Sequence, residues 1–450
     1  MTTILALALA SSLQAMPLPA ALLDIHQAGP ERVAALKSAA SWWIELGDSL
    51  LVASPEAQLA RISADSTVMR RFARLDPGEL ALQSRSCGTD DLAFNPALPT
   101  LAMAGRFALV QIPVRAARYP TAESEDYFPA QTHVAYAREW GNVVDLSKVT
   151  RIADPQVSAV VARVAPQRWS NALNTLASFD RSSYGSGIDQ ARDWLAQRFS
   201  SLGLEVELQS FSFAGSGGVN VQVETVIGKQ TGTEFPDQWI VVGGHYDSRN
   251  TNNTASGTAQ TPGAEDNASG CAGVLEMARV LRHTPPKRSV FFICYAGEEQ
   301  GLHGGIAHAA RWQTQGTLSR LRVALIMDMI GYSGDSDLDV LLETNSTHAA
   351  VLHPAWASYA SNYAPELRVV VTSSASGSDH VPYLQRNRPS LLTIENDWDS
   401  YAHYHRATDL PSNVSNALGM GGGILRMNAA ALAVEADTSD AIWRDPFEGD

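Results

Sequence analysis

The sequence has few of the features that would identify a disulfide framework or a thiolate metal site. It contains three cysteines in 450 residues, and Cys87, Cys271 and Cys294 form no short Cys-x-x-Cys pair. We expect them to be buried free thiols, because cysteine packs in protein cores as a small hydrophobic residue. A bridge between Cys271 and Cys294 is the alternative that the spacing leaves open.

Positive charge is also scarce. The chain has 33 Lys and Arg residues against 47 Asp and Glu residues, which gives a net charge of −14. Such a balance repels phosphate backbones and anionic membrane surfaces. We therefore expect no nucleic-acid partner.

Long apolar runs and several well-known motifs are missing as well. No run approaches the roughly 18 apolar residues that predict a membrane-spanning helix, so we expect no membrane insertion. The sequence contains no HExxH, P-loop or Rossmann motif, which argues against the enzyme classes that depend on them.

The N-terminus resembles a secretory signal with a weakly charged start. An apolar run over residues 4–10 is followed by small residues, Leu13-Gln14-Ala15 is a fair cleavage site, and the first basic residue is Arg32. We predict a signal peptide over residues 1–20 and a secreted or periplasmic protein. The alternative is an N-terminal helix that frays.

The remaining composition is that of a folded protein, with 45% hydrophobic and 18% charged residues. Residues 21–160 form a region of their own. We expect strands at Trp42–Leu46 and Phe107–Ile112 and a helix that begins at Ser54-Pro55. Composition does not choose between a pro-segment and a permanent small α/β domain here.

Residues 161–436 show short apolar runs that alternate with helical patterns, which predicts an α/β layer fold. An acidic tail follows over residues 437–450. The expected strands are Gln238–Val242, Ser289–Tyr295, Arg322–Met327, Leu338–Leu342 and Leu391–Ile394. The expected helices are one over residues 188–202 and those at Ala268–Arg282, Gly304–Gln313 and Gly421–Glu435.

Acidic residues and histidines follow several of these strands. In open α/β sheets, ligands bind beyond the carboxyl ends of the strands. Asp328 comes directly after an apolar strand, where an unpaired buried carboxylate would be costly. A bound cation is the simplest account of such residues from separate segments that converge on one sheet edge. They are His245, Asp247, Asp266, Glu298, Glu299, Asp328 and His405.

Six motifs around these residues occur in the order and spacing of a known family. They are GGHYDS at 243–248, GAEDNASG at 263–270, GEEQGL at 297–302, MDM at 327–329, SDH at 378–380 and YHRATD at 404–409. Over about residues 165–435 the chain resembles the co-catalytic di-zinc exopeptidases typified by secreted bacterial leucyl aminopeptidases, with glutamate carboxypeptidase II as a distant relative. The resemblance implies a three-layer α/β fold with a central mixed, mostly parallel sheet between helices.

The resemblance also implies a site for two Zn²⁺ ions. Asp266 would bridge the ions, His245 and Asp328 would complete the protein ligands of one, and Glu299 and His405 those of the other. Histidine and carboxylate ligands suit zinc, and two ions about 3.5–4 Å apart can hold both an attacking water and a carbonyl oxygen. Two divalent ions, three carboxylates and one hydroxide also sum to zero charge.

Three further residues resemble the catalytic machinery of that family. Glu298 would act as general base, taking a proton from the metal-bound water and passing it to the leaving amine. Asp247 would orient the imidazole of His245, with a turn-capping role as the alternative. Tyr404 resembles a tyrosine that hydrogen-bonds the oxyanion in some members. Other members place that tyrosine where this chain has Ala375, so Tyr404 could equally be an ordinary wall residue.

Supporting roles are implied for neighbouring residues. Asp379 and His380 resemble residues that support the ligands, and Asp409 would anchor the turn after His405. Ser378, Asp379 and His380 cannot form a serine-protease triad, because three consecutive side chains cannot converge as nucleophile, base and orienting group.

The leading hypothesis is a secreted metallo-aminopeptidase that acts on peptides with a free N-terminus. A carboxypeptidase or dipeptidase on the same site is the second, since Arg249, Arg386 or Arg406 could hold a free carboxylate. A single-zinc glutaminyl cyclase is the third hypothesis, and a non-catalytic domain of the same fold is the fourth.

Overall fold

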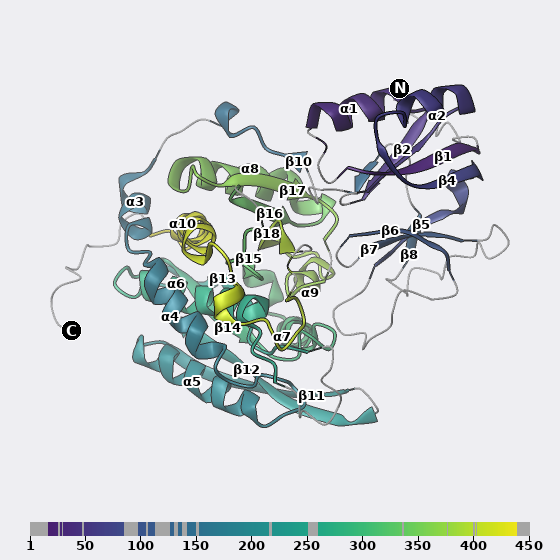
Figure 1. The fold of residues 1–450 in the computed structure, drawn as a ribbon. Helices are drawn as coiled ribbons and strands as arrows, with labels where there is room; N and C mark the ends of the chain where they lie inside the picture. The colour runs from purple at the N-terminus through teal and green to yellow at the C-terminus, as the bar shows by residue number, and fades with distance from the viewer. Residues whose placement is uncertain are drawn as a thin grey trace, which may run out of the picture. The chain divides into compact units, whose positions relative to one another are not determined.

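The chain divides into two compact units, residues 1–85 with 93–138 and residues 86–92 with 139–450. The structure is a computed structural model (Figure 1). It describes residues 17–25, 28, 30–46, 49–84, 98–104, 107–112, 127–129, 134–136, 142–149, 153–215, 218–250, 260–334, 337–375, 377–398, 401 and 403–438. The predicted acidic tail beyond residue 438 and Cys87 therefore lie outside the described residues.

In its described residues, the first unit contains two β-sheets and two α-helices. The five-stranded sheet has the order β4-β1-β3-β2-β9 and the four-stranded sheet the order β6-β7-β5-β8. The strands are β1 (Leu18–Asp24), β2 (Trp42–Leu46), β3 (Ser49–Ala53), β4 (Thr67–Leu75), β5 (Leu80–Ser84), β6 (Thr100–Ala104), β7 (Phe107–Gln111), β8 (Tyr127–Pro129) and β9 (Val134–Tyr136). The helices are α1 (Pro30–Ala39) and α2 (Glu56–Ile62). The two predicted strands are confirmed as β2 and β7, and α2 begins directly after Pro55.

The last residues of the predicted signal peptide belong to the first strand of this unit. Residues 1–16 lie outside the described residues, but Leu18 begins β1, which pairs with β3 on one side and β4 on the other. Removal of residues 1–20 would take away the first part of this central strand. Cleavage after Ala15 would leave β1 whole.

The second unit is built on a nine-stranded sheet of order β10-β17-β16-β18-β15-β13-β14-β12-β11. Its strands are β10 (Asn142–Val143), β11 (Glu205–Ala214), β12 (Asn220–Gln230), β13 (Phe235–His245), β14 (Arg288–Tyr295), β15 (Leu321–Met327), β16 (Asp339–Glu343), β17 (Arg368–Thr372) and β18 (Ser390–Glu395). The neighbours β14, β13, β15 and β18 are parallel, so their carboxyl ends meet at one edge. All five predicted strands of this unit are confirmed.

The sheet is mixed, as expected, but parallel pairings are not in the majority. Four pairings are parallel and four are antiparallel. The difference comes mainly from the hairpin of β11 and β12, which the sequence analysis did not predict. Most residues of β11 are exposed or half-buried, so the strand lacks the continuous apolar run that marks the central strands.

Helices cover both faces of this sheet, which confirms the three-layer arrangement. They are α3 (Pro155–Val161), α4 (Pro166–Leu176), α5 (Gly187–Ser201), α6 (Gly270–Leu281), α7 (His303–Thr314), α8 (Ser346–Tyr363), α9 (Val381–Leu384) and α10 (Ala417–Glu435). One core cluster joins α3, α4, α5, α6, α8 and α10 to the sheet, and a second joins α7 and α9 to its other face.

Helix α10 is apolar over its whole length. By length and composition alone it could cross a membrane, contrary to the expectation that no segment is so apolar, yet 72% of its most apolar window is buried inside the structure. It packs against α3, α4, α6 and α8. Its apolar character is therefore accounted for by its position in the core.

The cysteine expectation is wrong for one pair. Cys271 and Cys294 form a disulfide, with their Cα atoms 5.9 Å apart, which is within the usual range for a bridge. Cys271 lies in the first turn of α6 and Cys294 near the end of β14, and both are fully buried where the helix packs on the sheet. This bridge is the alternative that the sequence analysis left open, although a separation of 23 residues did not favour it.

We expect thiol labelling to detect this bridge. In denatured, unreduced protein, an alkylating reagent should modify only Cys87 of the three cysteines, and after reduction it should modify all three. Mass spectrometry of the labelled peptides distinguishes these states. Full labelling without reductant would contradict the bridge.

Candidate metal centre

His245 is the last residue of β13, at the centre of the parallel part of the sheet. The strand ends close to β15, since a Cβ on Gly244 would lie 2.7 Å from the main-chain oxygen of Met327. Nδ1 of His245 lies 3.0 Å from the main-chain oxygen of Asp247. If the proton of the neutral imidazole is on Nδ1 and is donated to this oxygen, Nε2 is unprotonated. Its lone pair is then directed into the site.

Asp266 lies on the segment that leads into α6. A residue far away in the sequence, Asp409, forms hydrogen bonds with the main chain of this segment. The Asp409 carboxylate accepts hydrogen bonds from the backbone N–H of Glu265 at 2.9 Å and of Asp266 at 3.0 Å. The hydroxyl of Tyr401 donates to the same carboxylate at 2.7 Å. Asp409 therefore anchors the Asp266 segment, whereas the sequence analysis assigned it to the turn after His405.

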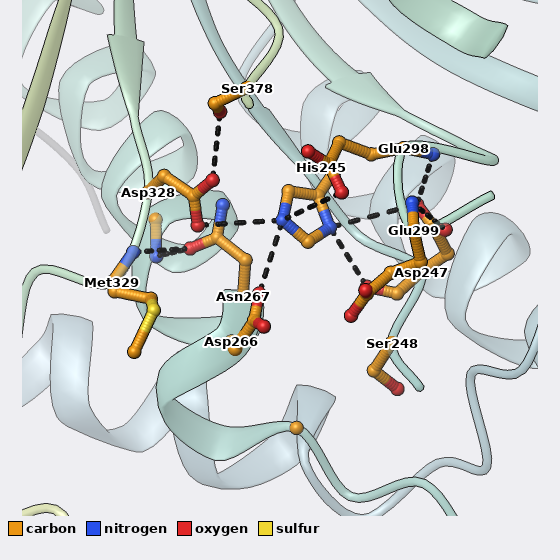
Figure 2. A network of polar contacts seen from close by, with 12 residues as sticks. His245, Asp247, Ser248, Asp266, Asn267, Glu298, Glu299, Asp328, Met329 and Ser378 are labelled. Carbon is orange, nitrogen blue, oxygen red and sulfur yellow. Dashed lines mark hydrogen bonds and ion pairs between the residues drawn. The ribbon is translucent and has the colours of Figure 1, made fainter. Parts of the chain in front are cut away.

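Glu298 and Glu299 follow β14, and Asp247 positions both of them. The Asp247 carboxylate accepts from the backbone N–H groups of the two glutamates, each at 3.2 Å. Its nearer oxygen is 3.7 Å from Nδ1 of His245, beyond hydrogen-bond distance. The main chain of Asp247 thus orients His245, while its side chain holds the glutamate turn (Figure 2).

Asp328 follows β15 directly, as the sequence analysis expected. The hydroxyl of Ser378 donates to Oδ2 of Asp328 at 2.7 Å, which leaves Oδ1 directed toward His245 (Figure 2). This contact gives the SDH motif a physical role that its sequence did not specify. His380, from the same motif, lies 3.3 Å from a carboxylate oxygen of Glu343 instead.

The five predicted ligands come together as two groups that share Asp266. Nε2 of His245 lies 3.3 Å from Oδ1 of Asp266 and 3.4 Å from Oδ1 of Asp328. Nε2 of His405 lies 3.0 Å from Oδ2 of Asp266 and 3.0 Å from Oε2 of Glu299. The two oxygens of one carboxylate therefore face two different histidines.

These distances suit zinc. Ligands at about 2.0–2.2 Å from a tetrahedral ion are about 3.3–3.6 Å apart. The separations around His245 fall in this range, and those around His405 are slightly shorter. Several buried atoms that point into the site also have no hydrogen-bond partner among the described residues, including Oδ1 of Asp328, both carboxylate oxygens of Glu299 and Nε2 of His405. The residues present therefore fit a metal centre.

The buried negative charge of the site also favours bound cations. Burial raises the pKa of Glu298 well above its usual value, and the Asp328 and Glu299 carboxylates raise it further. Burial opposes protonation of His405, but Glu299 and Asp266 together raise the pKa of its imidazole to about 9. Carboxylates this crowded and dry need positive charge beside them.

Tyr404 packs beside one of the ligands. Its ring stacks on the imidazole of His405, with centroids 3.8 Å apart, and meets Trp398 edge to face. The side chain is half-buried. This position is compatible both with a hydrogen-bond donor at the site and with a wall residue, which are the two roles that the sequence left open.

Arg181 is a supporting residue that the sequence analysis missed. It is fully buried, at 0% exposure. Its guanidinium donates at 2.6–2.7 Å to the main-chain oxygens of Leu176, Tyr246, Pro262 and Gly263. It thus ties the residue after His245 to the segment that carries Asp266. No spacing in the sequence connects Arg181 with the metal motifs.

The charge of Arg181 also matters to the site. Burial lowers the pKa of its guanidinium to about 10, while the nearby carboxylates, Asp409 and Asp247 foremost, favour the charged form. Arg181 therefore stays protonated at neutral pH and offsets part of the buried negative charge. Its hydrogen bonds go to carbonyls, so the acidic side chains stay available to other partners.

Comparison with known proteins shows that the part of the chain that carries this site is similar to a family of peptidases. Residues 225–420 match the model of peptidase family M28. A probable zinc metalloprotease of Pyrenophora teres f. teres is 32% identical over 230 residues, which cover 47% of this chain and 49% of that protein. The chain thus spans about half the length of this curated relative.

Solved structures share the fold at low sequence identity. The LapA aminopeptidase of Legionella pneumophila matches with a TM-score of 0.53 at 18% identity, over 80% of this chain and 98% of that one. A glutaminyl cyclase of an Acidobacteriales bacterium matches with a TM-score of 0.50 at 24% identity, over 62% and 97%. Aminopeptidases and cyclases thus have this fold in common.

We expect Arg181→Met to destabilise the second unit by about 3–5 kcal/mol, because it removes four hydrogen bonds to buried main-chain oxygens together with the positive charge beside the carboxylates. Arg181→Lys should cost less, since the ammonium keeps the charge but has fewer donors. Hydrogen exchange of peptides from β13 and β14 measures the effect in this unit alone. Arg61→Met, at an exposed position of α2, is the control, and unchanged protection in Arg181→Met would contradict the role.

Proposed function

We propose that the chain is a zinc-dependent exopeptidase that removes N-terminal residues from peptides, starting from the match of residues 225–420 to the model of peptidase family M28. The observation that carries the proposal is the pair of ligand groups that share Asp266. His245 and Asp328 would complete the protein ligands of one Zn²⁺ ion. Glu299 and His405 would complete those of the other.

Two bound zinc ions would supply an activated water and polarise the carbonyl of the scissile bond. The protein's own contribution is to hold the ligand atoms in place. Asp247 fixes the turn that carries Glu299, Ser378 orients Asp328, and Asp409 anchors Asp266. Preorganised ligands of this kind keep both metal positions formed at little cost when the ions bind.

Glu298 is the proposed general base. It is buried, and its Oε2 lies 3.8 Å from Nε2 of His245, so it borders the metal site without taking part in the closest ligand contacts. A carboxylate in this position can accept a proton from a water held in the metal site. The same proton can then be passed to the leaving amine.

The proposed substrate is a peptide with a free N-terminus. Its ammonium group would lie against the acidic edge formed by Glu298 and Asp328. We further propose that the hydroxyl of Tyr404 donates a hydrogen bond to the oxyanion, and the stacking of its ring on the proposed ligand His405 supports this role.

A carboxypeptidase or dipeptidase is the alternative on the same site. It would need a cation free to hold the substrate carboxylate. Arg249 donates to the main-chain oxygen of Glu299, and Arg386 to Gln313 and to the main-chain oxygen of Pro382, so both already have protein partners. These contacts argue against two of the three arginines considered, whereas Arg406 is exposed next to His405 and is the residue that a carboxypeptidase would have to use.

A single-zinc glutaminyl cyclase is the other alternative, and it has the same fold. The complete set of five ligand side chains favours two ions. Metal analysis of the purified chain separates the two proposals, because the peptidase should hold two zinc ions and the cyclase one.

We also propose that the protein is exported. The Cys271–Cys294 bridge supports this, since disulfides form and persist mainly in oxidising compartments. Export would agree with the signal-like sequence at the N-terminus.

The decisive test uses one peptide in free, N-acetylated and C-amidated forms. We expect stepwise loss of residues from the free N-terminus, seen by mass spectrometry, in the free and amidated forms only. A zinc chelator should stop the reaction because it removes the ions. Loss from the C-terminus would instead establish a carboxypeptidase, and cyclisation of an N-terminal glutamine without hydrolysis would establish a cyclase.

We expect Glu298→Gln to lower kcat by about 10²–10⁴-fold, the usual contribution of a general base, with zinc content near normal. Glu299→Gln should instead lose zinc along with activity, because it removes a ligand. The control is Glu56→Gln on the exposed surface of α2, which should alter neither property. The role of Glu298 would be refuted by turnover close to that of the unsubstituted protein.

A further inference from the structure

A second pocket lies in the same unit, away from the metal centre. It has a volume of about 380 Å³ and is lined by residues of α4, α5 and α6, none of which is a proposed metal ligand. The three helices lie on one face of the nine-stranded sheet, where α4 and α5 both contact α6 (Figure 1). This pocket has no part in the peptidase mechanism.

The charge of the pocket is opposite to that of the chain. Its lining contains four arginines, Arg168, Arg198, Arg279 and Arg282, and one carboxylate, Glu276. The lining thus carries a net charge of +3, from four positive groups and one negative, in a chain whose net charge is −14. Glu276 is paired with Arg279 at 2.6 Å.

The other three arginines have no such partner. Arg168, Arg198 and Arg282 form no ion pair with a carboxylate anywhere in the described parts of the chain. All three side chains are exposed, so their guanidinium groups are open to a ligand in the cavity. Guanidinium groups bind carboxylates and phosphates through paired, charge-assisted hydrogen bonds.

Helix dipoles explain only part of this arrangement. Arg198 lies in the last turn of α5 and Arg282 at the C-terminal cap of α6, where a positive charge is favoured. Arg168 is the third residue of α4, near the N-terminus, where the dipole disfavours a positive charge. A bound anion accounts for all three positions.

Apolar and aromatic groups form the rest of the wall. Trp194 is half-buried, and the Arg198 guanidinium lies 5.7 Å from its ring centroid. Trp169 is fully buried behind this wall, and its indole N–H donates to the main-chain oxygen of Ser269, so it offers a ligand no accessible surface. A ligand that fits this wall has a flat apolar part beside its charged group.

We propose that the pocket bounded by Arg168, Arg198, Arg282 and the Trp194 ring binds a small organic anion. The ligand joins a carboxylate or a phosphate group to a flat apolar body. The guanidinium groups hold the anionic oxygens, and the Trp194 ring contacts the body.

Calorimetric titration of the zinc-loaded full chain tests the proposal. The probes are phenylacetate and phenyl phosphate, with benzyl alcohol as the uncharged control. We expect one anion to bind per chain and the alcohol not to bind. Binding of one probe alone identifies the preferred anion and supports the proposal, as does binding of both. Failure of both probes, or equal binding of the alcohol, would overturn it.

Variants locate the binding. Arg198→Gln and Arg282→Gln should each weaken it about tenfold, the effect of one charge-assisted hydrogen bond. The control R61Q/R74Q removes two exposed positive charges from the first unit and should leave the affinity unchanged. Exposed arginines rarely carry folding stability, so the variants should stay folded. Equal affinity of R198Q/R282Q and the unsubstituted chain would refute the site.

Discussion

The repulsion among buried carboxylates at the end of the parallel strands is the constraint on which the second unit depends. Asp266, Glu298, Glu299 and Asp328 are all buried there, where negative charges are poorly screened. The histidines and the cation of Arg181 offset only part of this charge. Bound cations are therefore needed to neutralise the site. Before the cations bind, the fold must hold the acidic groups together against their mutual repulsion.

The fold holds the acidic groups through supporting residues that form hydrogen bonds with the main chain next to the ligand residues. The Asp247 carboxylate accepts hydrogen bonds from the two backbone N–H groups of the glutamate turn. The Asp409 carboxylate accepts from the backbone N–H groups of Glu265 and Asp266, and Arg181 donates to the main-chain oxygen of Gly263 in the same segment. Donors and acceptors are matched so that the ligand atoms themselves stay free. The central sheet supplies the rigid frame, because β13, β14 and β15 are parallel and fully packed between two helical layers.

Much of this could be predicted because the relevant signals are local. A buried parallel strand is a continuous apolar run, so β13, β14, β15 and β18 could be predicted from the sequence. The site residues that follow β13, β14 and β15 could then be predicted as well, because ligands bind beyond the carboxyl ends of such strands. Edge strands such as β11 were not predicted, since they are mostly exposed. The supporting contacts were assigned less well. The carboxylate of Asp247 holds the glutamate turn rather than His245, and Asp409 anchors Asp266 rather than its own turn.

Short runs of neighbouring residues specify the α/β class, the strands of the central sheet and the residue types that gather at its edge, so these could be predicted. Which of those residues face one another depends on how the elements pack. Asp409 meets the Asp266 backbone across 143 residues, and Arg163 meets Thr284 across 121. The packing also decided the Cys271–Cys294 bridge and the arginine pocket. Such contacts arise only when helices pack on the sheet, and packing joins side chains that no spacing along the chain connects.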